Sequence, residues 1–401
     1  MKNKIKLLVF LLPFNFGIVK AQMWTRYTET NSGLSSNAIS KIVVTSDNKK
    51  WITTYYGVSV FDGTNKWTTY TKANSGLADN VVFDMAIDSL GNKWFATARG
   101  VSKFNGTTWT TYNTANSELQ ADMIYSIAIG KNGKIYFGQS DNFITVLSGN
   151  TWTYHRVDYG NYHYDVNNIS VANSGNVYFS LRDEEFYRWV GNDLYTYEYP
   201  NTLLDYKVKS ILIDEANSKI WVGSQYGLNL LTASGTVKYD FLDLLGISSA
   251  EIYGIAIDGS NNKWLGSAEG LVKFDGINFT VFNTKNSGIP TNSVERIAID
   301  KNGIFWLANS GLTRYNPLAT GTDEIVSEEQ IEIYPNPTQT KFEVGCKGKV
   351  THVLVLDDLG RILIEENNYQ GEIDIESLSQ GIYYVQVKTE TGVVTKSIVK
   401  N

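Results

Sequence analysis

The chain has 401 residues, 19% of them charged, with three histidines, one cysteine and a formal net charge of −6. No run of lysines and arginines occurs anywhere in it, so binding to the phosphates of nucleic acid is not expected. The single cysteine, Cys346, excludes an internal disulfide framework.

Residues 1–21 have the pattern of a cleavable signal peptide. Three early lysines precede an apolar stretch from Leu7 to Val19, and Val19 and Ala21 are the small residues that a signal peptidase recognises. The stretch is too short to span a bilayer, although an uncleaved anchor is the alternative. No later segment has the length and apolarity of a transmembrane helix, so none is expected after cleavage. Removal of residues 1–21 would bring the net charge to about −10.

A motif that occurs seven times predicts the main fold. Each copy has an apolar run, a polar turn and then an aromatic residue, at intervals of 42 or 43 residues. These aromatics are Trp51, Trp94, Tyr136, Tyr178, Trp221, Trp264 and Trp306. In the second copy, strand-like runs cover residues 84–88, 93–97, 100–104 and 108–112, and turn residues separate them. Four strands at this interval predict a seven-bladed β-propeller over residues 22–318, in which the aromatics pack between blades.

The two ends of the repeat region complement each other. The seventh copy has three strands, ends at Tyr315 and lacks the fourth strand of the Trp-x-x-Tyr type. A matching segment, Trp24-Thr25-Arg26-Tyr27, stands at the start of the mature chain. This N-terminal strand is therefore predicted to complete the last blade and close the ring, which would protect an open sheet edge.

Residues 23–316 resemble the two-component regulator propeller repeat. The resemblance rests on Asn74-Ser75-Gly76-Leu77, Trp94, Gly100-Val101 and Phe104-Asn105-Gly106, and it is weaker in the third to fifth copies. In that family such propellers form the periplasmic sensing part of membrane-bound kinases. Because this sequence contains neither the kinase nor its membrane helix, the sensor role is not expected to carry over.

A polar, acidic linker at 319–330 separates the repeats from a second, smaller domain at 331–401. Seven strand-like runs follow the linker, near 331–334, 340–345, 350–356, 361–366, 371–375, 382–388 and 393–399. About 70 residues of short strands predict a small Ig-like β-sandwich. The fold class expected for the chain is therefore all-β.

This second domain resembles the C-terminal sorting domain of the type IX (Por) secretion system of Bacteroidetes-like bacteria. The residues that carry the resemblance include Tyr334, Pro335, Asn336, Pro337, Gly360, Gly381, Tyr383 and Lys396. The resemblance implies that the type IX secretion machinery is a partner and that the protein crosses the periplasm to the outer cell surface or the medium. It also implies that the domain is cleaved off there. An ordinary Ig-like accessory domain is the alternative.

The sequence shows little catalytic chemistry. It has no zinc-ligand spacing, phosphate-binding glycine loop or nucleophile elbow, and no cofactor is expected. Four acids that recur at the blade interval are predicted to cap turns rather than to bind calcium: Asp88, Asp214, Asp258 and Asp300. One cluster, His155, Asp158, His163 and Asp165, could hold a metal, but a polar surface loop is the favoured interpretation.

The third to fifth copies depart from the repeat, and their departures supply the candidate ligand-binding residues. These residues are Tyr159, Tyr162, His163, Tyr164, Arg182, Asp183, Glu184 and Tyr199. They belong to loops that open on one face of a propeller, where aromatic rings beside charges suit a sugar or a peptide. Degenerate repeats without a function would have the same pattern.

The function expected from the sequence is an exported, non-catalytic propeller that binds a glycan, peptide or protein ligand outside the cell. One alternative is a metal-dependent propeller lyase or hydrolase, since a family of antibiotic-cleaving lyases also uses seven-bladed propellers. The other is a structural or adhesion component of the cell surface.

Overall fold

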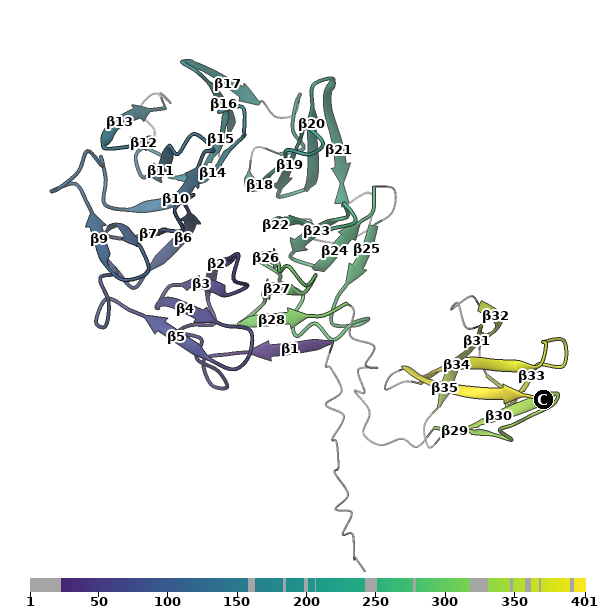
Figure 1. Cartoon of the computed structure of the whole chain (residues 1–401). Helices are drawn as coiled ribbons and strands as arrows, with labels where there is room; N and C mark the ends of the chain where they lie inside the picture. Colours follow the sequence, from purple (N-terminus) through teal and green to yellow (C-terminus); the bar gives the residue numbers. More distant parts are fainter. Residues whose placement is uncertain are drawn as a thin grey trace, which may run out of the picture. The chain divides into compact units, whose positions relative to one another are not determined.

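A computed structural model describes residues 23–157, 163–182, 185–197, 201–205, 207–241, 251–276, 279–317, 331–346, 349–357, 362–367, 369–389 and 393–401. The chain divides into two compact units, Trp24–Leu318 and a unit that contains Ala319–Asn401. Throughout the described ranges the elements of both units are β-strands (Figure 1). Within those ranges no helix has the length and apolarity needed to cross a membrane.

The described part of the Trp24–Leu318 unit contains seven four-stranded antiparallel sheets. Six of them consist of four strands that are consecutive in the sequence. The first three sheets are β2 (Ile39–Val44), β3 (Lys50–Thr54), β4 (Gly57–Phe61) and β5 (Trp67–Tyr70); β6 (Val82–Ile87), β7 (Lys93–Thr97), β8 (Gly100–Phe104) and β9 (Trp109–Tyr112); and β10 (Ile124–Ile129), β11 (Ile135–Gln139), β12 (Phe143–Ser148) and β13 (Thr151–Arg156). The next three are β14 (Val166–Val171), β15 (Val177–Leu181), β16 (Phe186–Val190) and β17 (Asp193–Tyr197); β18 (Val208–Asp214), β19 (Lys219–Ser224), β20 (Gly227–Thr232) and β21 (Gly235–Asp240); and β22 (Ile252–Ile257), β23 (Lys263–Ser267), β24 (Gly270–Phe274) and β25 (Phe279–Phe282).

The seventh sheet joins the two ends of this unit. It consists of β26 (Arg296–Ile299), β27 (Phe305–Ala308), β28 (Leu312–Tyr315) and β1 (Trp24–Tyr27), in the order β26-β27-β28-β1. Trp24 pairs with Tyr315, and their rings stack with centroids 4.2 Å apart. The ring of Tyr27 contacts that of Phe61 in the first sheet, with centroids 5.3 Å apart. The predicted pairing of the N-terminal strand with the last repeat is therefore confirmed.

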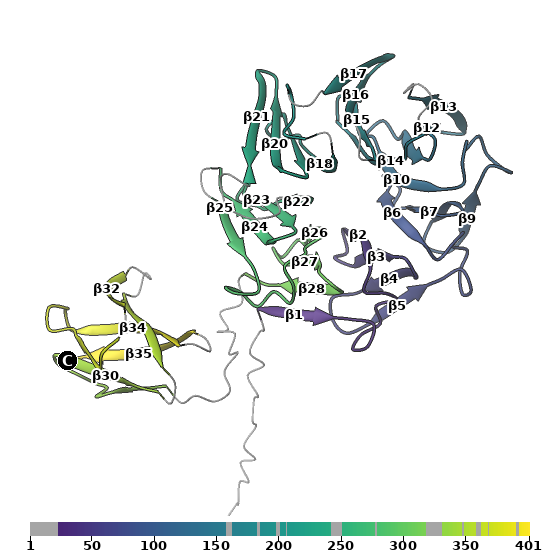
Figure 2. The same ribbon diagram turned by 180° about the vertical axis from the view of Figure 1, so that it is seen from behind.

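The sheets lie side by side around a common centre, with the first strand of each innermost (Figures 1 and 2). Each first strand contacts the first strand of the next sheet, in the series β2, β6, β10, β14, β18, β22 and β26, and β26 contacts β2. An all-β unit of repeated four-stranded sheets in this arrangement is propeller-like.

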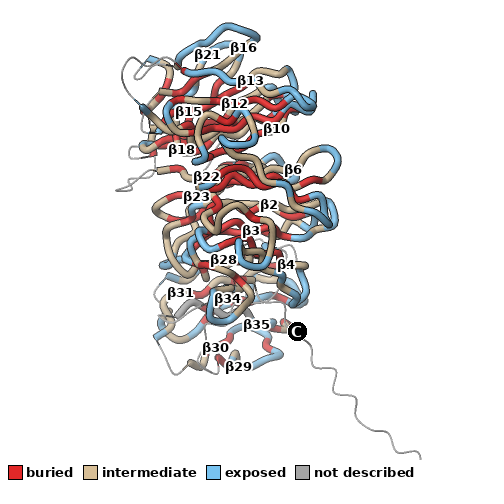
Figure 3. Tube along the Cα trace, turned by 90° about the vertical axis from the view of Figure 1, so that its left-hand side faces the viewer, coloured by how far each residue is buried: buried red, intermediate tan, exposed pale blue. Residues whose placement is uncertain are grey.

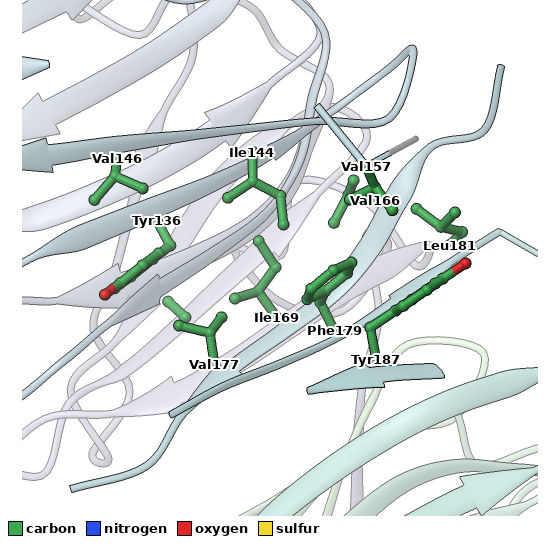
Figure 4. Packing of buried hydrophobic residues seen from close by; sticks show 11 residues of the cluster. Tyr136, Ile144, Val146, Val157, Val166, Ile169, Val177, Phe179, Leu181 and Tyr187 are labelled. Carbon is green, nitrogen blue, oxygen red and sulfur yellow. The ribbon is translucent and has the colours of Figure 1, made fainter. Parts of the chain in front are cut away.

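Buried side chains from neighbouring sheets interlock, and the repeated aromatics take part in this packing. Trp51 contacts Phe95 of the next sheet, and Trp94 contacts Phe137, with ring centroids 6.0 and 6.1 Å apart. Between the third and fourth sheets, where the repeat is irregular, Phe179 and Tyr187 fill the corresponding space (Figure 4). Figure 3 shows that the buried residues concentrate in the strands. The predicted packing role of these aromatics is confirmed.

The recurring aspartates hold the turns between the first and second strands. One oxygen of Asp88 accepts the backbone N–H groups of Leu90 and Asn92, at 3.0 and 2.9 Å. The other accepts the indole N–H of Trp94 at 2.9 Å. Asp258 and Asp300 bond their own turns and tryptophans in the same way. The turn-capping prediction is confirmed for these three and for Asp214, which accepts the backbone N–H of Asn217 at 3.2 Å. The bond to tryptophan, made by Asp88, Asp258 and Asp300, is an addition that the sequence did not reveal.

The described part of the C-terminal unit contains two antiparallel sheets. The first, in the order β29-β30-β33, contains β29 (Glu332–Tyr334), β30 (Lys341–Gly345) and β33 (Glu372–Asp374). The second, in the order β32-β31-β34-β35, contains β31 (Val350–Leu356), β32 (Ile362–Asn367), β34 (Gly381–Thr389) and β35 (Val393–Lys400). Buried residues from both sheets, among them Phe342, Val355 and Val385, share one hydrophobic cluster.

Candidate binding surface

Loops from neighbouring sheets are bonded to one another on one face of the Trp24–Leu318 unit. The backbone N–H of Gly100, the residue with which β8 begins after the loop from β7, donates to the carbonyl of Asp122, in the loop that leads to the next sheet. Asn142 donates to Tyr164 in the same way at 2.8 Å. The carbonyl of Asp165 accepts the backbone N–H of Arg182 at 2.8 Å. These bonds confirm that the loops between second and third strands lie beside the loops that lead to the next sheet. The candidate residues of both kinds of loop therefore share one face, as predicted.

An ion pair and a histidine–aspartate contact lie in this loop region. A guanidinium nitrogen of Arg182 lies 3.1 Å from Asp165 Oδ2, and His163 Nδ1 lies 3.2 Å from Asp141 Oδ1. Arg182 is about half exposed, whereas the Asp165 side chain is 19% exposed. Burial raises the pKa of the Asp165 carboxyl, and the positive charge of Arg182 opposes this effect.

Arg182 also lies over an aromatic side chain that the sequence did not single out. Its guanidinium carbon is 5.1 Å from the ring centroid of Tyr125, a cation–π distance. Burial and the neighbouring Asp165 carboxylate raise the pKa of the Tyr125 phenol. The ring of Tyr125 in turn packs against that of Phe83, with centroids 5.1 Å apart. The ring of Phe83 packs against that of Tyr55, with centroids 6.1 Å apart. We call Tyr55, Phe83 and Tyr125 the aromatic row.

A β-bulge explains why Phe83 and Tyr125 do not enter the core. Both first strands shift register at these residues, between Val82 and Asp84 in β6 and between Ile124 and Ser126 in β10. The residues on either side of each bulge are buried, whereas Phe83 and Tyr125 are half-buried. A bulge re-aims the side chain of the extra residue, so each aromatic is left out of the strand's own packing.

A comparison of the repeats could have found the aromatic row. The bulge position holds Ser40 in the first repeat and Asn167 in the fourth, so aromatic residues there are not needed for the fold. Tyr55 follows the second strand of its sheet, at the position that Arg182 occupies in the fourth sheet and Ala98 in the second. Irregularity of the repeats does not point to these residues, because Tyr55 and Phe83 belong to regular repeats.

The other candidate ligand-binding residues fall into two groups. Tyr164 is partly buried and packs against the hydrophobic cluster between the third and fourth sheets, so it supports the loop from inside. Tyr159, Tyr162, Asp183, Glu184 and Tyr199 lie outside the described residues.

The structure does not bring the candidate metal ligands together in the part of the chain that it describes. His155 packs edge-on against Trp189, with ring centroids 4.1 Å apart, whereas His163 pairs with Asp141. Burial lowers the pKa of His155. Among the described residues, no group of three or more His, Cys, Asp and Glu side chains is placed to hold a metal ion. Asp158, the fourth candidate ligand, lies outside those residues.

One of the sorting-motif residues, Asn336, is bonded to the final strand of the C-terminal unit. The Asn336 side chain donates to the carbonyl of Ser397 and accepts the backbone N–H of Val399, each at 2.9 Å. The buried Lys400 ammonium donates to the carbonyls of Glu376 and Leu378. The side chain of Asn336 therefore holds the final strand, β35, in place through hydrogen bonds.

The remaining motif residues differ in exposure. Tyr383 is buried, and its hydroxyl donates to the carbonyl of Ser379 at 2.8 Å. Tyr334 is 48% exposed, and the bonds from it to Pro335 and from Asn336 to Pro337 are cis. Gly381 and Lys396 are exposed, at the start of β34 and in β35 respectively. Gly360 lies outside the described residues.

Comparison with known proteins identifies this C-terminal region. Residues 332–401 match the family model of the secretion system C-terminal sorting domain. The chain therefore carries a sorting domain of the Por secretion system at its C-terminal end, which implies export to the cell surface or outside the cell.

Histidine kinase P4 of Formosa agariphila is a curated relative. It is 26% identical over 142 residues, which are 32% of this chain and 10% of that protein. The chain thus spans only a small part of the relative it matches.

Solved structures with a similar fold include extracellular domains, a surface protein and a lyase. The extracellular domain of a hybrid two-component system protein of B. thetaiotaomicron matches 94% of this chain with a TM-score of 0.67 and 16% identity. PorZ, a surface component of the type IX secretion system of Porphyromonas gingivalis, matches 92% with a TM-score of 0.59 and 16% identity. The chain spans 54% and 60% of these two structures. Virginiamycin B lyase of Staphylococcus aureus matches 73% of this chain, with 97% of its own length covered, a TM-score of 0.58 and 16% identity. At these identities the matches establish the propeller-like fold.

Proposed function

We propose that this protein is an exported, non-catalytic β-propeller that binds a glycan, peptide or protein ligand outside the cell. In this proposal residues 1–21 are a cleaved signal peptide, residues 22–318 are a closed propeller of seven blades, and 319–330 are a linker. Residues 331–401 are an Ig-like sandwich that serves as the address for the type IX machinery. The sorting domain and the likeness to extracellular propellers support the export half of the proposal.

The observation that carries the binding half is the group formed by Arg182, Asp165 and Tyr125. Three side chains from two sheets converge on the loop face, and Asp165 is mostly buried there although it is charged. Burial of a carboxylate at a surface is unfavourable unless a partner compensates it, so this arrangement is built rather than incidental. Fixed polar groups beside an aromatic ring are typical of ligand sites.

An array of glycans and peptides tests the proposal, with the mature chain, residues 22–401, as the probe. We expect at least one ligand whose binding is weakened by Asp165→Asn, because the variant frees Arg182 from its partner. The matched control is Asp193→Asn, at an exposed position at the start of the outer strand β17. Absence of any ligand on the array would favour the structural or adhesion role.

Metal analysis of the purified protein separates binding from metal-dependent catalysis. We expect no stoichiometric metal. A bound metal that is lost in both His155→Ala and His163→Ala would instead establish the enzyme alternative.

A further inference from the structure

We propose that the aromatic row and Arg182 form one binding surface for a neutral carbohydrate. This inference rests on the proposed function and deepens it by naming the ligand class. It also moves the centre of the site away from the loops of the irregular repeats and toward the first two sheets.

The surface is continuous across four consecutive sheets. Tyr55 belongs to the first sheet, Phe83 and Tyr125 to the second and third, and Arg182 to the fourth. Ring centroids are 6.1 Å apart for Tyr55 and Phe83 and 5.1 Å apart for Phe83 and Tyr125. Arg182 continues the series at 5.1 Å from Tyr125. Each member therefore touches the next, although no two of them come from the same sheet.

The row is exposed in a way that the fold itself does not require. Tyr55 is 45% exposed, and alanine occupies its position in the second and sixth repeats, at Ala98 and Ala268. The bulges hold Phe83 and Tyr125 out of the strand packing. Large aromatic side chains in contact with one another at a surface, at positions where the same fold accepts alanine or serine, indicate a binding site rather than a core.

The positive charge of Arg182 is already neutralised within the protein. Arg182 pairs with Asp165, His163 lies beside Asp141, and both acids come from the same loop region. An anion would have to displace Asp165 from Arg182, and it would also meet the carboxylate of Asp141. The surface therefore disfavours uronic acids, sulfated sugars and acidic peptides.

A neutral sugar matches both features of the surface. Its C–H face can lie on the aromatic rings, which are tilted at 72° and 43° to one another and so offer more than one plane. Its hydroxyl groups can both donate and accept. They can donate to the oxygens of Asp165 and accept from the guanidinium N–H groups of Arg182 without a change of net charge.

The test compares ligand classes on one array with the mature chain, residues 22–401. The array carries neutral oligosaccharides of glucose, mannose, galactose and xylose, oligosaccharides with uronic acid or sulfate groups, and peptides. We expect the neutral oligosaccharides to bind. For the strongest of them, Tyr125→Ala and Tyr55→Ala should each weaken the affinity by about two- to tenfold in titration calorimetry, which is the loss expected for one aromatic contact.

Tyr154→Ala is the matched control. Tyr154 is 51% exposed, and its ring centroid lies 6.1 Å from that of Phe143 at an interplanar angle of 71°. This geometry is nearly that of Tyr55 with Phe83, but Tyr154 lies on the outer strand β13. We expect its affinity to equal that of the unaltered protein. Arg182→Lys keeps the charge but loses the planar stack, so an intermediate affinity is expected. Thermal melting of every variant checks the fold.

Each other outcome overturns a defined part of the argument. Neutral sugars that bind equally well to the Tyr55 and Tyr125 variants would place their site elsewhere and overturn the inference. Selective binding of acidic sugars or peptides would overturn the ligand class and leave the proposed binding function standing. An array without any bound ligand would overturn both.

Discussion

The second and fourth sheets of the propeller have the same strand order but different turn chemistry. In the second, Asp88 bonds the turn and the indole of Trp94. In the fourth, the corresponding residues are Ala172 and Tyr178, and the turn keeps its two backbone hydrogen bonds, 2.8 and 2.9 Å long, without a carboxylate. The strands nevertheless pair in equivalent register, because Met85 faces Phe95 in one sheet as Ile169 faces Phe179 in the other.

This difference shows which positions determine the sheet. Buried apolar residues on alternate positions suffice to set the register, since a slip of one residue would turn them toward solvent. The Asp and Trp pair adds stability without deciding the fold. Positions outside the packing are free to differ between repeats, and Tyr125 and Arg182 occupy such positions.

Removal of β1 should have the largest effect on this architecture. Deletion of residues 22–29 takes away the stacked Trp24 and leaves β28 as an open edge. The loss should exceed the roughly 3–5 kcal/mol of a single buried Trp or Phe truncation, with aggregation through the exposed strand. Thermal melting and light scattering measure it. A deletion variant that melts like its parent would show that the sheets are held together without β1.

The turn aspartates should differ in importance according to their partners. Asp300 of the seventh sheet pairs with Lys50 of the first at 3.0 Å, and both side chains are almost completely buried. Asp300→Ala would leave Lys50 buried without its partner, at a cost of about 3–5 kcal/mol in the free energy of unfolding. Asp88→Ala, which loses hydrogen bonds to the turn and to Trp94 but no buried lysine, should cost about 1–3 kcal/mol. Urea denaturation gives both values, and equal costs would contradict the special role of the Lys50 pair.

The pH dependence of stability should also identify Asp300. Burial raises the pKa of its carboxyl, but the bonds from Trp306 and Lys50 outweigh this and bring it below the ordinary value of 3.8. A lowered pKa in the folded state contributes stability that is complete above the ordinary value and is lost as the pH falls through the folded one. The stability difference between the protein and Asp300→Asn should therefore be constant near about pH 6 and shrink below 3.8. A difference that stays constant in acid would contradict this assignment.

Removal of the sorting domain should have the smallest effect on the propeller. The two units have separate hydrophobic clusters, so residues 22–318 should melt at nearly the temperature of the propeller transition in residues 22–401. Export should respond in the opposite way, with the shortened protein folded in the periplasm of a type IX bacterium and absent from its surface. Cell fractionation measures this, and surface delivery of the shortened protein would contradict the sorting role.

The sequence by itself determined the repeated sheets, the strand pairing at the two ends and the sorting domain. These features depend on local alternation of apolar residues and on a fixed interval, and both can be read along the chain. The turn aspartates were predicted for the same reason, since Asp88 bonds residues only two and four positions away.

Only the tertiary structure decided which side chains meet on the loop face. Tyr55 and Arg182 are separated by more than a hundred residues, and the bulges at Phe83 and Tyr125 depend on strand register that no single repeat reveals. The partner of Tyr125 is a guanidinium from the next sheet, and the partner of Lys50 is an acid of the last one. The first contact arises because consecutive sheets pack side by side, and the second because the last sheet lies beside the first.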